Sequence, residues 1–345
     1  MSHLHTLTLV LGLSAALQAQ GTVKISIGVR ETEAGGGSFT TIGGNGGTLG
    51  GIEWVNKDAQ TLVLDGTWQQ FTFNITTDPL AAFAGTTANG VLDGTFGVIE
   101  HLRVLNDTGI TDPFVLWIDD VTATTQTGGP VNFGDFEGYG SGAEVMFQEP
   151  SFSGSTSAFL LPGSVSGVDN AVASRTSSCR CDFQFVNNTT TNWVRLTTFN
   201  TGFLPNPTIR LDDQCVVTFW MRGGPCQEDV GSQGPGTAYA EMCGAGLSAG
   251  QASIYYAAGA QPGVPGVLGI SLWGAGDLPI FGGNIVAGLG LAATLPVSAD
   301  AAGRFQLPVT GSAGVVDLAL QSLFFDPTLP QNLAFTNAIR ARFGQ

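Results

Sequence analysis

The stretch FVLWIDDVTATTQTGGPVNFGDFEGYG, at residues 114–140, decides how the chain is organised. Its aromatic and branched aliphatic residues predict a β-strand that carries Asp119 and Asp120 near its end. The segment TTQTGGP, which follows at 124–130, has the composition of a turn. A second strand with Glu137 is expected directly after it. The stretch therefore bears on the number of domains, on a candidate metal site and on whether the strands before and after the turn belong to one sandwich.

Apolar and polar side chains alternate along much of the remaining sequence. Phe71, Phe73 and Ile75 alternate with polar neighbours, and the same pattern recurs at 25–30 and 217–222. A period of two is typical of half-buried strands. With 345 residues, 50 glycines and only 11% charged residues, the composition favours about two domains of short strands and tight turns. We therefore predict an all-β protein.

The formal net charge of −15 limits the classes of partner. Beyond residue 20 the lysines are Lys24 and Lys57 alone, so nucleic acid and anionic lipid are poor partners, whereas divalent cations are better ones. No run in this part of the sequence reaches the roughly 18 apolar residues that a membrane-spanning helix needs.

The first 20 residues indicate export, and the five cysteines allow a disulfide. Residues 1–20 are expected to be a secretory signal, because the segment from Leu4 to Leu17 is largely apolar and Ala19 is a small residue at a plausible cleavage point. We therefore expect a protein that is extracellular or lies at the cell surface. The five cysteines leave at least one unpaired, and a disulfide is expected between Cys226 and Cys243, which flank a loop.

A change in composition divides the chain near residue 226. The segment 226–238, rich in Gly and Pro, is expected to link a first domain, 21–225, to a second and smaller β-sandwich, 239–345, which has few charges. Within the second domain, GLGLAATLPVSADAAGRFQLPVTG at 288–311 has the pattern of a β-hairpin.

Short blocks on both sides of the turn at 124–130 point to one known fold. They are ISIGVRET (25–32), TWQQFTFNI (67–75) and LWIDDV (116–121) on one side, and FGDFEGY (133–139) with WVRLTT (193–198) on the other. Together they resemble the two halves of a galactose-binding-like jelly roll, the β-sandwich of many carbohydrate-binding modules. In that family the block with FEGY comes first, whereas here it comes second. The resemblance implies one circularly permuted sandwich with halves 21–125 and 131–223, or alternatively two incomplete sandwiches in tandem.

The tail carries a second resemblance. SADAAGRFQLPV (298–309) and LAFTNAIRARFG (333–344) are similar to a C-terminal β domain of secreted proteins from planctomycete bacteria. That domain looks like a surface or sorting module, so the resemblance implies no activity for the tail.

The first resemblance also implies a structural Ca²⁺ that joins Glu137 to Asp119 or Asp120. Calcium takes six to eight oxygen ligands, among them carboxylates. For a sugar, aromatic rings offer stacking surfaces, and the candidates are Trp54, Trp193 and Tyr139, although tryptophans of a sandwich are mostly core residues.

Catalysis finds little support in the sequence. Beyond the expected signal the single histidine is His101, and the string GLSAG at 246–250 lacks the later histidine that a nucleophile elbow requires. His101 and Arg103 are expected on one strand face, as a satisfied pair at the surface or at a sheet edge.

These observations predict an exported, non-enzymatic protein that binds extracellular polysaccharide or other cell-surface components. The alternative is a structural or adhesive surface component that self-associates and has no specific sugar site. A polysaccharide-active enzyme is the remote third alternative.

Overall fold

The computed structural model describes residues 21–32, 51–170, 175–198, 209–231, 234–244 and 246–344. The expected secretory signal at 1–20 lies outside these ranges. Within them the regular structure is β-strand apart from two short 3-10 helices, η2 (Ser157–Phe159) and η3 (Gly288–Gly290). The predicted all-β class is confirmed, and no helix of the described ranges is long and apolar enough to cross a membrane.

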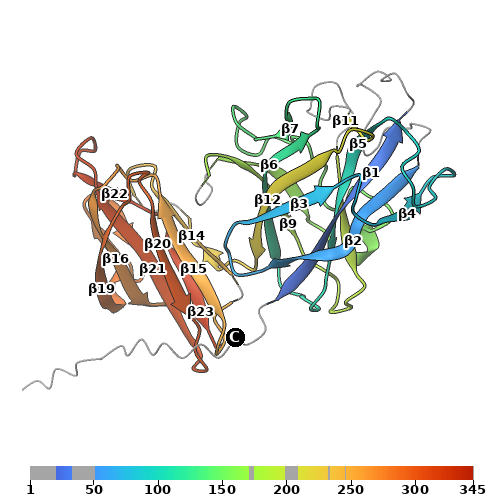
Figure 1. Ribbon diagram of the computed structural model, residues 1–345. Helices are drawn as coiled ribbons and strands as arrows, with labels where there is room; N and C mark the ends of the chain where they lie inside the picture. Colours follow the sequence, from blue (N-terminus) through green and yellow to red (C-terminus); the bar gives the residue numbers. More distant parts are fainter. Residues whose placement is uncertain are drawn as a thin grey trace, which may run out of the picture.

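Two six-stranded sheets form the first sandwich (Figure 1). Sheet I contains β1 (Thr22–Thr32), β2 (Ile52–Val63), β4 (Leu80–Ala84), β5 (Phe96–Leu105), β10 (Trp193–Thr197) and β11 (Ile209–Arg210). Its order is β10-β5-β1-β2-β4, and β11 also pairs with β5. Sheet II contains β3 (Gln69–Asn74), β6 (Phe114–Thr124), β7 (Val131–Gly134), β8 (Val165–Asp169), β9 (Ser178–Phe183) and β12 (Val216–Gly224). Its order is β3-β12-β6-β9-β8, and β7 pairs with β6.

Strands from both halves of the N-terminal region pair with one another. β10, from the second half, pairs with β5 in sheet I, and β12 lies between β3 and β6 in sheet II. The apolar core between the sheets likewise draws on both halves, with Ile25 and Phe73 from one and Phe136 and Phe219 from the other. The two halves therefore form one sandwich.

The alternating pattern explains why these segments form sheets with one buried face. In β3 the side chains of Phe71 and Phe73 are buried, whereas Thr72 between them is exposed. Successive side chains of a strand point to opposite faces, so the phenylalanines enter the core while the threonine faces solvent.

A second, smaller sandwich follows. Sheet III contains β13 (Glu228–Asp229), β16 (Pro265–Leu272), β19 (Leu291–Ser298), β21 (Val316–Phe325), β22 (Leu333–Phe335) and β23 (Ile339–Phe343). Its order is β13-β23-β21-β16-β19, with β22 paired to β21. Sheet IV contains β14 (Tyr239–Gly244), β15 (Ala252–Ala258) and β20 (Phe305–Thr310), in the order β14-β15-β20, and a separate hairpin joins β17 (Leu278–Ile280) to β18 (Gly283–Ile285). Met242 and Tyr255 of sheet IV pack with Leu268 and Phe324 of sheet III in a second apolar core.

Two features of the second sandwich differ from the sequence patterns. The segment 288–311 is not a hairpin, because β19 pairs with β16 in sheet III while β20 pairs with β15 in sheet IV. Part of the segment expected as a linker, 226–238, belongs to sheet III, since β13 pairs with β23. The predicted disulfide between Cys226 and Cys243 is confirmed, and it ties this segment to β14.

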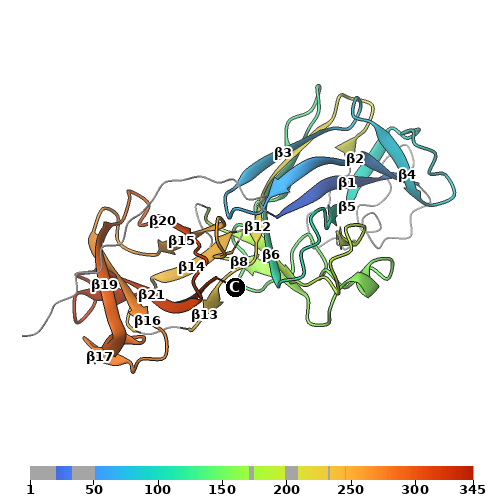
Figure 2. The ribbon, with the colours of Figure 1, turned by 90° about the horizontal axis from the view of Figure 1, so that it is seen from below.

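β12 of the first sandwich lies beside β14 of the second (Figure 2). An ion pair joins these two strands. Arg222 Nη1 of β12 is 2.6 Å from Glu241 Oε1 of β14, and the guanidinium lies over the ring of Trp117 at 4.4 Å. Burial raises the pKa of Glu241 and Arg222 opposes this rise. Together with the disulfide, the pair therefore connects the first sandwich to the second.

Removing the disulfide is expected to destabilise the second sandwich. A double Cys226→Ser and Cys243→Ser variant should lose about 3 kcal/mol of unfolding free energy, because the closed loop no longer restricts the unfolded chain. Urea denaturation without reductant measures the loss. The wild-type protein in reductant should unfold like the double variant, and an unchanged urea midpoint in the variant would contradict the prediction.

Candidate functional site

Six side chains gather on the outer face of sheet I, the face turned away from the core. We call them the outer-face cluster; they come from β2, β4, β5 and β10 and are Trp54, Phe83, His101, Arg103, Trp193 and Arg195. The ring of Trp54 stacks on Phe83 with 4.4 Å between centroids and meets Trp193 edge-on at 5.7 Å. Two of the three aromatic residues predicted to contact a ligand are therefore in contact with each other.

A β-bulge in β5 places two adjacent polar side chains on this face. His101 lies opposite Gly28 and Ile99 opposite Val29, so Glu100 is an extra residue in the strand. Residues that follow one another in a regular strand point to opposite faces, and an inserted residue interrupts this alternation. Ile99 remains in the core, and Glu100 and His101 contact each other on the outer side.

A larger irregularity in β2 faces the same region. Ile27 pairs with Val55 and Ile25 with Gln60, so that the four residues 56–59 stand opposite Ser26 alone, three more than a regular ladder holds. Asn56 and Asp58 adopt positive φ angles of 52° and 57°, which are uncommon for residues other than glycine. The insertion brings Asp58 Oδ1 to 2.8 Å from Arg103 Nε, and it places Lys57 Nζ 4.5 Å from the ring centroid of Trp54.

The hydrogen bonds of His101 determine its tautomer. Trp54 Nε1–H lies 2.9 Å from His101 Nε2, and since an indole nitrogen can only donate, Nε2 must be the unprotonated acceptor. The proton of the neutral ring is therefore on Nδ1, which donates to Glu100 Oε2. Burial lowers the pKa of His101, in agreement with a neutral ring. Both ring nitrogens are thus occupied by protein partners.

Glu100 is the buried acceptor of this network, with none of its surface exposed. In addition to His101, its carboxylate contacts the guanidinium of Arg195 and lies 3.7 Å from Arg30 Nη2. Burial raises the pKa of Glu100, but the contacts with His101, Arg195 and Arg30 outweigh this effect and leave the pKa below its ordinary value. The carboxylate is therefore charged, and Arg195 is held with its guanidinium 5.2 Å from the ring centroid of Phe83.

The expectation for His101 and Arg103 is correct in one respect and wrong in another. Both side chains contact the Trp54 and Trp193 rings on the outer face, as the spacing of two residues predicts. They do not lie at the surface or at a sheet edge, because β5 runs between β10 and β1 and both residues are buried. The aromatic rings cover the polar groups of this strand.

Tyr139, the third residue predicted to contact a ligand, lies elsewhere. It is half-buried and packs against the apolar core of the first sandwich, and its backbone carbonyl accepts a hydrogen bond from Asn170. The structure does not bring Tyr139 into the outer-face cluster.

The carboxylates predicted to bind calcium have protein partners. Arg175 Nη1 is 2.9 Å from Asp119 Oδ2 and also contacts Asp120, and its guanidinium lies between the rings of Trp68 and Trp220.

Glu137 is exposed, and its carboxylate is 3.4 Å from Ser177 Oγ. Calcium needs several oxygens around one point, whereas here an arginine cation lies between the two aspartates, and no group of three or more acidic, histidine or cysteine residues suited to a metal occurs in the described part of the chain. The side chains as placed do not fit a calcium site, and calcium binding stays a prediction.

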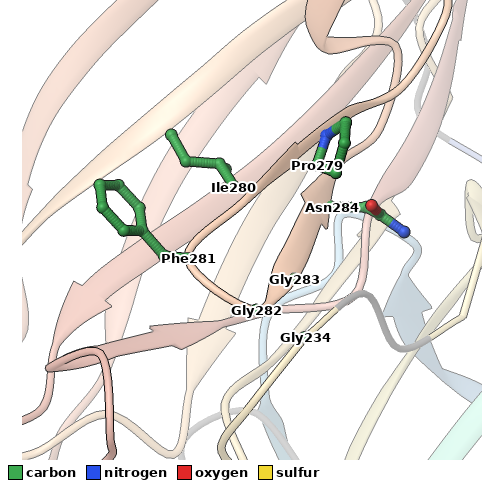
Figure 3. Close-up of a pocket in the computed structure, with 7 residues that line it drawn as sticks. All are labelled: Gly234, Pro279, Ile280, Phe281, Gly282, Gly283 and Asn284. Carbon is green, nitrogen blue, oxygen red and sulfur yellow. The ribbon is translucent and has the colours of Figure 1, made fainter.

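The second sandwich has an open depression beside the hairpin of β17 and β18 (Figure 3). It is lined by Gly234 and by residues 279–284 of the hairpin, and Ile280 and Phe281 point away from Asn284. Since its lining contains neither an ionisable group nor a nucleophile, the depression offers no catalytic chemistry.

Comparisons of the chain with protein-family models, with curated proteins and with solved structures found no match.

Replacement of Gly28 tests the close approach of His101. A Cβ atom at residue 28 would lie 2.0 Å from Cε1 of the His101 ring, so the ring would have to leave its hydrogen bonds to Trp54 and Glu100. We expect Gly28→Ala to lower the unfolding free energy by about 1–3 kcal/mol in urea denaturation. Gly129→Ala is the matched control because no atom lies within 4 Å of the added Cβ there. Equal stability of the two variants would show that the ring position is not constrained.

The pKa of Asp119 predicts a pH dependence of stability. Burial raises this pKa from 3.8 to about 6, and a hydrogen bond from Arg175 opposes the rise. Between about pH 4 and 6 the folded state binds more protons at Asp119 than the unfolded state, so this contribution to stability falls as the pH rises. Asp119→Asn should remove it. Urea denaturation from pH 4 to 7 measures the effect as the difference between variant and wild type. Asp112→Asn is the control that should keep the wild-type slope, because Asp112 is exposed and is not among the groups that shift the pKa of Asp119. A wild-type slope in Asp119→Asn would contradict the assignment.

Proposed function

We propose that the protein is an exported, non-enzymatic glycan-binding protein and that the outer-face cluster is its sugar-contacting surface. The observation that carries this proposal is the grouping of Trp54, Phe83 and Trp193 on one sheet face, beside cationic side chains. Sugar rings present C–H faces that stack on aromatic rings, while their hydroxyl groups take hydrogen bonds from charged side chains.

The accessibility of the cluster suits a binding surface. Phe83 and Trp193 are half-buried, while Trp54 and Arg103 beneath them are buried. The two half-buried rings stand 5.7 Å apart and nearly perpendicular, so they form the accessible part of the cluster and the buried pair supports them. A rigid aromatic surface of this kind binds with little loss of side-chain entropy.

The state of His101 supports binding without catalysis. A general base needs an accessible nitrogen within hydrogen-bonding distance of the substrate, but His101 is fully buried and both of its ring nitrogens have partners. Its role in the proposal is to hold Trp54 and Glu100 in place.

The disulfide supports the location outside the cytoplasm. Disulfides persist in oxidising compartments, and Cys226 and Cys243 are bonded. A surface location also agrees with the resemblance of the first sandwich to galactose-binding-like modules. Relative to those modules, the two halves of this chain would be permuted.

A structural or adhesive surface component is the second candidate. The second sandwich exposes large apolar side chains, among them Leu289 at 71%, Leu272 at 52% and Phe281 at 51% of their surface. Exposed apolar surface favours association with another protein. A strictly monomeric protein at high concentration would count against this candidate.

Replacement of Trp193 tests the proposal. A glycan array with the wild-type protein identifies ligands, and Trp193→Ala should weaken their binding at least about fivefold, because about 1–3 kcal/mol of ring contact is lost. Trp273→Ala is the matched control, since Trp273 is also half-buried with its ring against an arginine guanidinium but lies in the second sandwich. Binding that survives Trp193→Ala would assign the sugar to another surface, and an array without any ligand would overturn the function itself.

A further inference from the structure

The outer-face cluster collects an unusual share of the positive charge in an acidic protein. The whole chain has 12 lysine and arginine residues against 27 acidic ones. Four of these 12 lie on or beside the cluster, namely Arg30, Lys57, Arg103 and Arg195. The charge at this place is thus opposite in sign to that of the protein as a whole.

The carboxylates of the region do not neutralise the four cations. Asp58 pairs with Arg103, while Glu100 is shared between Arg30 and Arg195. His101 is neutral, as its hydrogen bond from Trp54 requires. Among the described residues of this region, these four positive and two negative charges leave an excess of two positive charges around the aromatic rings.

Lys57 is the member of the group that is positioned to meet a ligand. It is exposed, its Nζ lies 4.5 Å from the ring centroid of Trp54, and none of the ion pairs between described residues involves it. The insertion at 56–59, with its positive φ angles at Asn56 and Asp58, places it there. Backbone strain of this kind costs free energy and persists where the surrounding structure enforces it.

We propose that the ligand of the outer-face cluster is an acidic glycan, in which a sugar ring packs on Trp193 and Phe83 while its carboxylate or sulfate group pairs with Lys57 and the neighbouring arginines. This inference rests on the proposed glycan-binding function and names the class of sugar. A neutral sugar would leave the excess positive charge without a partner. A nucleic acid, a long polymer with a charge at every phosphate, would extend past the cluster and be repelled by the rest of the protein, because the whole chain has a net charge of −15.

Matched oligosaccharides test the proposal by calorimetry. Galacturonic acid oligomers, sulfated galactose oligomers and neutral galactose oligomers of equal length are compared on the wild-type protein at low and high NaCl. Acidic oligomers should bind at least tenfold more tightly than neutral ones at low salt, and this advantage should shrink at high salt because ions screen exposed charges. The two acidic arms distinguish a carboxylate from a sulfate ligand.

The lysine variants give the residue-level test. Lys57→Ala should weaken acidic binding about fivefold and leave neutral binding within twofold, in the range expected for one exposed ion pair. Lys24→Ala is the matched control, since Lys24 is the other lysine of sheet I but pairs with Thr61 and Asp107. Equal affinity for neutral and acidic oligomers would overturn the acidic class and leave glycan binding intact. Tighter binding of a single-stranded oligonucleotide would also overturn it, whereas no binding of any oligomer would count against the proposed function.

Discussion

The buried carboxylate of Glu100 is the group on which the outer face of sheet I depends. An isolated charge in such a position costs several kcal/mol, and it is tolerated here because Arg195, Arg30 and the N–H of His101 surround it. Each partner is oriented by this contact. His101 presents its second nitrogen to Trp54, and Arg195 lies over Phe83. The buried Glu100 carboxylate therefore orients the side chains that support the aromatic rings.

Two interruptions of strand register make this arrangement compatible with a sandwich. The inserted Glu100 in β5 allows an acidic residue and a histidine to share one face, and the insertion at 56–59 in β2 brings Asp58 and Lys57 over the same region. Both lie on strands that pair with β1, where Gly28 leaves room for the His101 ring. The outer face of sheet I thus gains polar side chains, while the side chains on its inner face remain apolar.

The strands could be predicted from the sequence more readily than the cluster. Alternation at 69–75 shows which residues are buried, and Trp54 and Trp193 could be chosen as candidates because the chain has only 6 tryptophans. Their contact depends on pairing between β10 and β5, which are far apart in the sequence, and no local pattern encodes that pairing. The role of Glu100 depends on a bulge, which shifts a side chain to the other face without any signal in composition. The hairpin predicted at 288–311 is wrong for a similar reason. Two successive strands show the same alternation whether they pair with each other or belong to different sheets.

The pairing of both chain halves within each sheet has a consequence for how the protein folds. β12 lies in the interior of sheet II, between β3 and β6, although its residues are the last of the first sandwich to be synthesised. Sheet II therefore cannot be completed until residue 224 is available, and its contacts span well over 100 residues of chain between Phe73 and Val217. Such distant contacts slow folding, because a long loop must close before any of them forms. The first sandwich is consequently expected to fold late and cooperatively. Until β12 has been synthesised, its earlier strands stay accessible to proteins that bind unfolded chains.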